Sequence, residues 1–228
     1  MRLNGNNMLQ RTSAFIGKRR MRWKALHRCQ AGISLTEFAL ALPILMVLGT
    51  TGLELGNYIT TMRKVSDLTA MMSDNASRMG GQSILGARPI TETEINDLLD
   101  GAVLQGGPLD IQRHGRIIIS SIELNADGGQ WIHWQRCKGD FDYTSRIGSA
   151  GDGATGTDYD SFGEGEGVAA SSQNAIMMVE FAFDYKMLVP VVDLDLGPIT
   201  ESVAFNIRDK RDLSQVYNPD SATIASCS

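Results

Sequence analysis

The feature that most constrains this chain is an uninterrupted apolar segment near its amino terminus. It extends over Ile33–Leu53, reads ISLTEFALALPILMVLGTTGL, and contains one charged residue, Glu37. At about 1.5 Å rise per residue these 21 residues cover roughly 30 Å, the thickness of the hydrocarbon core of a bilayer. The segment therefore predicts a transmembrane helix. A cleaved secretory signal is the alternative, but the stretch is long, and no small-x-small cleavage site with a polar mature start follows it.

The charged residues are distributed unevenly around this segment. Residues 1–32 contain eight Lys and Arg and no Asp or Glu, whereas residues 33–228 contain 13 basic and 26 acidic residues, a net charge of −13. Positive charge next to an apolar segment favours retention of that end in the cytoplasm. We therefore expect residues 1–32 to be a basic cytoplasmic leader. A nucleic-acid partner is not expected, because the main domain is acidic.

Helical periodicity continues after the apolar segment. Apolar residues recur at steps of three and four among polar neighbours, at Ile59, Met62, Val65, Leu68, Met72, Ala76 and Met79. This spacing predicts an amphipathic extension, so that residues 33–80 form one long helix ending near Gly80-Gly81. A short anchor followed by a separate core helix, with a break at Gly56, remains the alternative.

Residues 81–228 have the pattern of a small extracytoplasmic domain. Thr91 to Glu94 (TETE) resembles a capped helix start and precedes a short amphipathic helix. Four segments have strand character: 116–124, 130–136, 175–185 and 199–208. The turn sequence NADGG at 125–129 joins the first two into a hairpin. The predicted fold class is α+β, a long amino-terminal transmembrane and stalk helix followed by an antiparallel sheet packed on helices.

A Gly-, Asp- and Ser-rich stretch at 148–167 separates the hairpin from the third strand. It predicts a long exposed acidic loop. Hard cations such as calcium bind several carboxylates on flexible backbone, but the EF-hand pattern is not met. With Asp158 as its first position, Phe162 occupies the fifth and Ala169 the twelfth. No metal site is predicted.

The chain has three cysteines, Cys29, Cys137 and Cys227. Loss of residues 1–32 would leave an even pair. In an oxidising periplasm, Cys137 and Cys227 would form a disulfide between the middle of the domain and its tail. Two free buried thiols are the alternative.

The junction between leader and apolar segment carries the most specific motif. It reads Gly32-Ile33-Ser34-Leu35-Thr36-Glu37-Phe38 and continues Ala39-Leu40-Ala41-Leu42-Pro43. The first part resembles the site that prepilin peptidases cut in type IV pilins, after a glycine that precedes a glutamate at the fifth mature position. The continuation resembles the TadE-like family of minor pilins. The resemblance implies cleavage between Gly32 and Ile33.

The same resemblance implies a function. The chain would be a noncatalytic minor pilin, or pseudopilin, of a Tad (Flp-type) pilus assembly apparatus in the bacterial inner membrane, with the carboxy-terminal domain in the periplasm. Implied partners are a prepilin peptidase, other pilins, inner-membrane assembly proteins and the lipid bilayer. Adhesion, biofilm formation and secretion are the roles it suggests, and no cofactor is expected.

The physical case for Glu37 is independent of that resemblance. A carboxylate at the centre of a membrane helix costs about 2.5 to 3.5 kcal/mol on insertion scales, and less near the interface. After cleavage, the α-amino group of Ile33 on the same or a neighbouring subunit could neutralise it, and a position in the first helical turn would add a favourable dipole interaction. A carboxylate that only reaches the interface is the alternative. Pro43 can kink the helix, and Gly52-x-x-x-Gly56 could let helices approach closely.

An enzyme is not expected. Outside the leader the histidines are His114 and His133, and neither belongs to a ligand pair or a Cys/His motif. Glu54, near the outer end of the apolar segment, is predicted to be solvated. The main alternative function is an uncleaved single-pass protein with a periplasmic receptor or scaffold domain. An anchored periplasmic binding enzyme would need a convergent polar pocket.

Overall fold

The structure is a computed structural model that describes residues 31–80, 86–163, 167–172, 174–189 and 196–227. It divides into two units, Met1–Leu53 and Glu54–Ser228, each described by itself. Of the predicted leader, only Ala31 and Gly32 fall within the described residues, and the rest of that prediction lies outside them.

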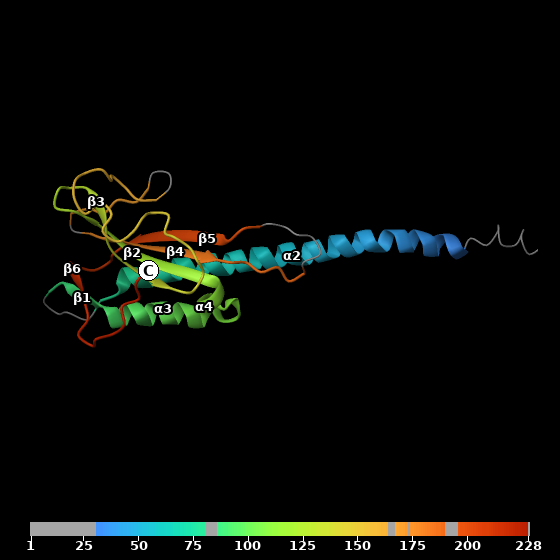
Figure 1. Ribbon diagram of the computed structural model, residues 1–228, viewed down its shortest axis with the longest axis horizontal. Helices are drawn as coiled ribbons and strands as arrows, with labels where there is room; N and C mark the ends of the chain where they lie inside the picture. Colours follow the sequence, from blue (N-terminus) through green and yellow to red (C-terminus); the bar gives the residue numbers. More distant parts are fainter. Residues whose placement is uncertain (1–30, 81–85, 164–166, 173, 190–195, 228) are drawn as a thin grey trace, which may run out of the picture. The chain divides into compact units, whose positions relative to one another are not determined.

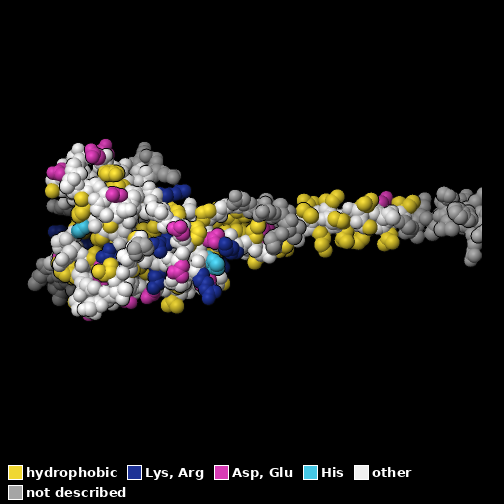
Figure 2. All heavy atoms as spheres, viewed as in Figure 1, with side chains coloured by type: hydrophobic (Ala, Val, Ile, Leu, Met, Phe, Trp, Pro, Cys, Tyr) yellow, Lys and Arg dark blue, Asp and Glu magenta, His cyan; other side chains and the backbone are white. Residues whose placement is uncertain are grey.

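Helix α2, Ala31–Arg78, provides all of the described part of the first unit and the start of the second. Every side chain from Ile33 to Leu48 is exposed, and Figure 2 shows hydrophobic side chains over this part of the helix. Among the described residues, α2 alone is long and apolar enough to cross a membrane, judged by length and composition, criteria that a signal sequence also meets. The helix includes Gly56 without a break, so the alternative of a separate core helix is not what the structure contains.

The second unit is built around a four-stranded antiparallel sheet in the order β3, β2, β4, β5 (Figure 1). Its strands are β2 Gly115–Leu124, β3 Gln130–Lys138, β4 Ile176–Phe183 and β5 Ile199–Asn206. The predicted hairpin is confirmed, with Leu124 opposite Gln130 across the turn. The predicted α+β class, a long apolar helix followed by a small domain with an antiparallel sheet and helices, is also what the structure has.

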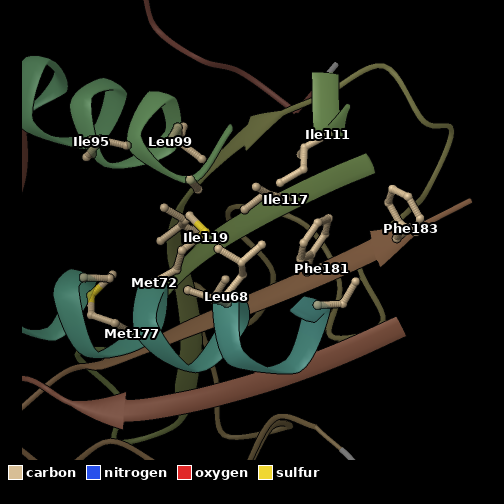
Figure 3. Close-up of a cluster of buried hydrophobic side chains, with 14 of the residues drawn as sticks. Leu68, Met72, Ile95, Leu99, Ile111, Ile117, Ile119, Met177, Phe181 and Phe183 are labelled. Atoms are coloured by element: carbon tan, nitrogen blue, oxygen red, sulfur yellow. The ribbon is translucent and has the colours of Figure 1, made fainter. Parts of the chain in front are cut away.

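Helices cover one face of this sheet. Helix α3, Glu92–Gly106, begins with the predicted cap: the Thr91 hydroxyl accepts from the Glu94 amide and the Glu94 carboxylate accepts from the Thr91 amide. Two short turns follow, η1 Gly107–Leu109 and α4 Ile111–His114. Apolar residues of α2 and α3 converge on alternate residues of β2 and β4, as Figure 3 shows for Leu68, Met72, Ile95, Leu99, Ile117, Ile119, Met177 and Phe181.

The opposite face is covered by the connection between β3 and β4. Ile147 and Phe162 of this connection pack on Ile122 and Ile132 in a second apolar cluster. Its backbone also bonds the outer edge of β3: the Gln130 amide donates to Tyr159 O (2.9 Å), and the Ile132 amide donates to Asp152 O (2.9 Å). Most described residues of the loop predicted at 148–167 are exposed, but Phe162 is buried and the backbone of the loop protects a strand edge.

A second, two-stranded sheet was not predicted. Strand β1, Arg88–Thr91, pairs in parallel with β6, Arg211–Tyr217. The chain between β5 and β6 lies at the carboxyl end of α2. The Arg208 amide donates to Ser77 O (3.2 Å), and Arg211 Nη2 donates to Ala76 O (3.0 Å) and Met79 O (2.7 Å). These donors satisfy carbonyl groups that the end of a helix leaves without intrahelical partners.

Candidate functional site

The predicted processing and assembly residues lie at the start of α2. Gly32 is inside the helix, and Ile33, Glu37 and Phe38 are exposed. Since α2 is described from Ala31, Glu37 is not in its first turn, which contains no acidic residue. The expected dipole interaction of Glu37 concerns the cleaved chain and stays a prediction, because this effect fades beyond the first turn of a helix. It would require a helix that begins at Ile33.

The predicted packing residues of α2 leave room for a neighbour. Pro43 lies within the helix. At Gly52 and at Gly56 a methyl group in place of an α-hydrogen would meet no described atom within 4 Å. The small surface that close helix association requires is therefore present at both glycines, although nothing described in this structure occupies it.

The structure corrects the prediction for Glu54. The sequence predicts a solvated side chain, but Glu54 is buried, with 3% of its surface exposed. Its carboxylate accepts hydrogen bonds from the Tyr185 hydroxyl (2.6 Å) and from the amides of Leu188 (3.0 Å) and Val189 (3.1 Å). A buried carboxylate is stable only with such compensation, which here comes from the segment that follows β4.

Tyr185 links this segment to α2 in two further ways. The Asn57 amide donates to the Tyr185 hydroxyl (2.7 Å), and the rings of Tyr58 and Tyr185 meet edge to face with centroids 5.1 Å apart. Burial, and then the hydrogen bond to Glu54, raise the pKa of Tyr185 above its ordinary value. The phenol therefore stays protonated at neutral pH and acts as a donor. The cluster is a polar clasp between α2 and residues 185–189.

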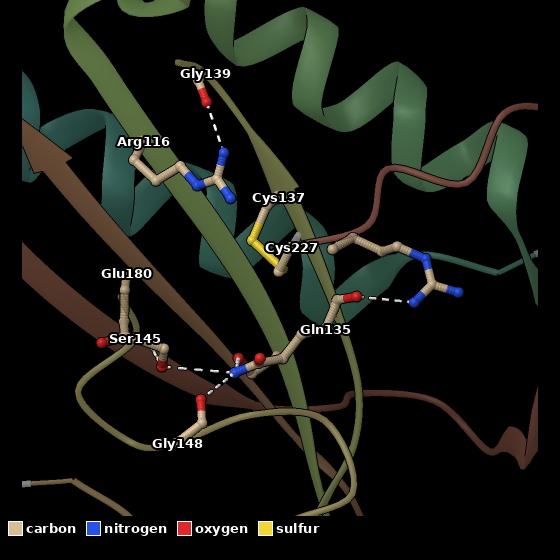
Figure 4. Close-up of a disulfide and its surroundings, with 10 residues drawn as sticks. Arg116, Gln135, Cys137, Gly139, Ser145, Gly148, Glu180 and Cys227 are labelled. Atoms are coloured by element: carbon tan, nitrogen blue, oxygen red, sulfur yellow. Dashed lines mark hydrogen bonds between the residues drawn. A yellow bond between two sulfur atoms is a disulfide. The ribbon is translucent and has the colours of Figure 1, made fainter. Parts of the chain in front are cut away.

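The carboxy-terminal tail is attached to the sheet by a disulfide. Cys137 of β3 is bonded to Cys227, with Cα atoms 4.9 Å apart (Figure 4). Cys137 is buried and Cys227 is exposed. The Cys137 amide also donates to Ala225 O (2.8 Å), so the tail continues the protection of the outer edge of β3. These are the two cysteines that remain when the leader is excluded.

A polar pocket of about 420 Å³ lies beside this disulfide, between the sheet and residues 140–149. Its polar groups mainly bond one another. Gln135 Nε2 donates to Ser120 Oγ (3.0 Å) and Gly148 O (3.0 Å), as Figure 4 shows in part. Arg116 Nη1 donates to Gly139 O (2.8 Å), and Glu180 accepts from the Ser145 hydroxyl. The described lining residues include no histidine or lysine that could activate the Ser145 hydroxyl, and these internal hydrogen bonds give the pocket the character of a structural polar layer.

His133 lies next to a carboxylate and a serine, but not in the order of a catalytic triad. His133 occupies a bulge in β3, where its ring stacks on Trp131 and its Nδ1 lies 2.9 Å from Glu123 Oε2. Ser121 Oγ donates to the same carboxylate (2.7 Å). The carboxylate thus lies between serine and histidine, whereas nucleophile activation needs the histidine between the other two. In the described part of the chain, no group of three or more His, Cys, Asp or Glu could hold a metal ion.

The residues that sequence reasoning placed in the apolar helix and those of the Glu54 clasp therefore form two separate candidate sites. The first is an exposed apolar surface with one carboxylate, which suits association with lipid or with other helices. The second is an internal attachment.

Comparisons of the chain with models of protein families, with curated proteins and with solved structures found no match.

Proposed function

We propose that this chain is a noncatalytic minor pilin, or pseudopilin, of a Tad (Flp-type) pilus assembly apparatus. A prepilin peptidase would remove residues 1–32, and the apolar helix would hold the subunit in the bacterial inner membrane with its acidic domain in the periplasm. The observation that carries the proposal is the motif from Gly32 to Pro43, with Glu37 as the only charge in an apolar segment of membrane length.

The surface of the helix supports an assembly function. Apolar side chains are exposed around the described part of unit one, including Ile33, Phe38 and Leu40. In water such a surface would be unfavourable, so it needs lipid or other helices as its environment. The second unit has its own core and a disulfide that suits an oxidising compartment. These features fit a subunit stored in a membrane and then packed into a fibre through its helix.

Glu37 would guide that packing. On cleavage, Ile33 gains a free α-amino group, whose positive charge can neutralise the Glu37 carboxylate of the same or a neighbouring subunit. Because both charges are poorly solvated in lipid, pairing them lowers the cost of burying either one. The pair would therefore favour one axial register between adjacent helices, while Gly52 and Gly56 allow close contact.

The test is the mass of the protein after expression with and without a prepilin peptidase of a Tad system. We expect loss of residues 1–32 only when the peptidase is present. The variant Gly32→Ala should abolish or sharply reduce cleavage. Gly49→Ala is the matched control, because it changes an α2 glycine that also has open space around it, and it should be cut normally.

An unchanged full-length mass in the presence of an active peptidase would contradict the proposal. The peptidase must cleave a known pilin substrate in the same cells. In that case the uncleaved single-pass protein with a periplasmic receptor or scaffold domain would be favoured, because an Arg-rich leader would remain in the mature protein.

A further inference from the structure

Residues 188–189, which follow β4, are attached to α2 at Glu54, where the apolar segment ends. Glu54, which accepts the amides of Leu188 and Val189, is the next residue after Leu53 in the chain. The contact is made by backbone groups and a buried carboxylate, so the position of residues 188–189 relative to this turn of α2 is fixed. Any membrane boundary near residue 53 would therefore be close to this segment.

The segment presents an apolar side chain outward. Leu188 is 67% exposed although its own amide is bonded to Glu54. Leu55 and Ile59 of α2 are exposed as well. They lie two and six residues beyond Leu53, which at about 1.5 Å per residue is within roughly 10 Å along the helix. The polar headgroup region on each side of a bilayer is about 5 to 8 Å deep, so Leu55 lies within that depth and Ile59 at its outer limit.

The aromatic residues of the clasp have the character of an interfacial pair. Tyr58 and Tyr185 combine apolar rings with hydroxyl groups, and tyrosine is enriched where a membrane meets water. The neighbouring charge is compensated, because Lys186 Nζ lies 2.5 Å from Asp184 Oδ2. The segment thus presents the exposed Leu188 beside two half-buried tyrosine rings, without a net positive charge.

We propose that residues 184–189 form a membrane-surface contact in which Leu188 enters the lipid interface and fixes how deeply the apolar helix sits in the bilayer. The occupant of this surface is lipid, and the contact is apolar. The inference rests on the membrane-spanning part of the proposed function and not on cleavage or pilus assembly. Because Lys186 is paired, binding should not require anionic lipid.

The test uses the full-length chain in lipid nanodiscs, which are open to solution on both faces. In a Cys29→Ser background with the disulfide intact, an environment-sensitive fluorophore is attached at Leu188→Cys. Leu104→Cys is the matched control, since Leu104 is an exposed leucine of α3 in the same unit. Leu45→Cys reports on the apolar segment. Quenching is measured with aqueous iodide and with lipids that carry a nitroxide on the acyl chain.

We expect the probe at residue 188 to be quenched by nitroxide lipid and severalfold less by iodide than the probe at residue 104, in neutral and in anionic discs alike. Equal iodide quenching at 188 and 104 would overturn the inference, and so would protection at 188 only in anionic discs. Protection from both quenchers would also overturn it, since it would mean contact with protein. If the probe at residue 45 is not quenched by nitroxide lipid, the membrane-spanning premise itself fails. Intact mass of labelled protein under non-reducing conditions verifies the disulfide in each variant.

Discussion

Removal of the disulfide is predicted to destabilise the second unit strongly, even though Cys227 is near the end of the chain. The perturbation is Cys227→Ser, which leaves Cys137 as a free thiol under the tail. The bond joins residues 90 positions apart, and this loop contains β4, β5 and β6. The cross-link therefore restricts the unfolded chain over two of the four strands of the main sheet and over β6.

The magnitude follows from loop-closure entropy. For a loop of about 90 residues the chain-entropy model gives roughly 4.6 kcal/mol at 25 °C, within the range of about 2 to 5 kcal/mol observed when native disulfides are removed. The tail has other attachments, such as the Asn96 side chain donating to Thr223 O (2.7 Å). Each such neutral hydrogen bond contributes only about 1 kcal/mol. We therefore expect a loss of about 4 kcal/mol, and most of it belongs to the cross-link.

The assay is urea unfolding of the full-length chain in detergent, followed by tryptophan fluorescence, because Trp134 is in the core of the second unit. With a slope near 2 kcal/mol/M the midpoint should fall by about 2 M. The urea midpoint of Cys137→Ser should fall by a similar amount, and that of the double variant should fall by no more than that of either single variant. Midpoints that agree within about 0.3 M for the oxidised and variant proteins would refute the argument, as would thiols of the wild-type protein that react freely with an alkylating reagent.

Three further outcomes are expected. Arg211→Met should lower the free energy of unfolding by about 3 kcal/mol in the same assay, because two carbonyl groups at the end of α2 lose a buried charged donor. Arg208→Met removes the exposed ion pair with Asp74 and should lower it by under about 1 kcal/mol. Equal losses of stability in the two variants would contradict this expectation. The pKa of Tyr185 is higher in the folded protein than its ordinary value of 10.0. The protonated phenol therefore contributes its full stabilisation below about pH 10, and this contribution is lost as the pH rises through the pKa of the folded state. Tyr185→Phe should remove that alkaline loss, and an unchanged pH profile of the urea midpoint would contradict it. Glu37→Gln should leave cleavage and membrane insertion intact and prevent fibre assembly; normal fibre number and normal crosslinking to pilin partners would show that the carboxylate is a passive interface residue.

Elements with a strong local signal were predictable from the sequence. The capping box at Thr91 and Glu94 determines where α3 begins, through short-range hydrogen bonds. The NADGG turn determines where the hairpin reverses, through its turn geometry. The β1–β6 pair has no such signal. Strand β1 has four residues and includes Pro89, and β6 is mostly polar, so their pairing depends on contacts between distant parts of the chain.

The 148–167 stretch shows how composition can mislead. Its Gly, Asp and Ser content correctly indicates that most of its described residues are exposed, yet Phe162 is 3% exposed. One aromatic residue within a polar segment adds a buried anchor on the sheet, and the flexible glycines let the chain reach the edge of β3. Composition averages over the segment, whereas burial is decided residue by residue.

Glu54 shows why a single residue can be misjudged even when its position is informative. The buried stripe of α2 includes Thr61, Val65, Leu68 and Met72, and Glu54 continues it toward the amino terminus by seven residues, two helical turns. The spacing thus indicates that Glu54 faces the domain. Its charge predicts a solvent-exposed side chain, because the hydrogen-bond partner that compensates it, Tyr185, is 131 residues away and gives no local signal in the sequence. Helical periodicity predicts the orientation of Glu54 correctly, because it indicates which face of the helix carries a side chain. Charge indicates only that a buried side chain must have hydrogen-bond partners.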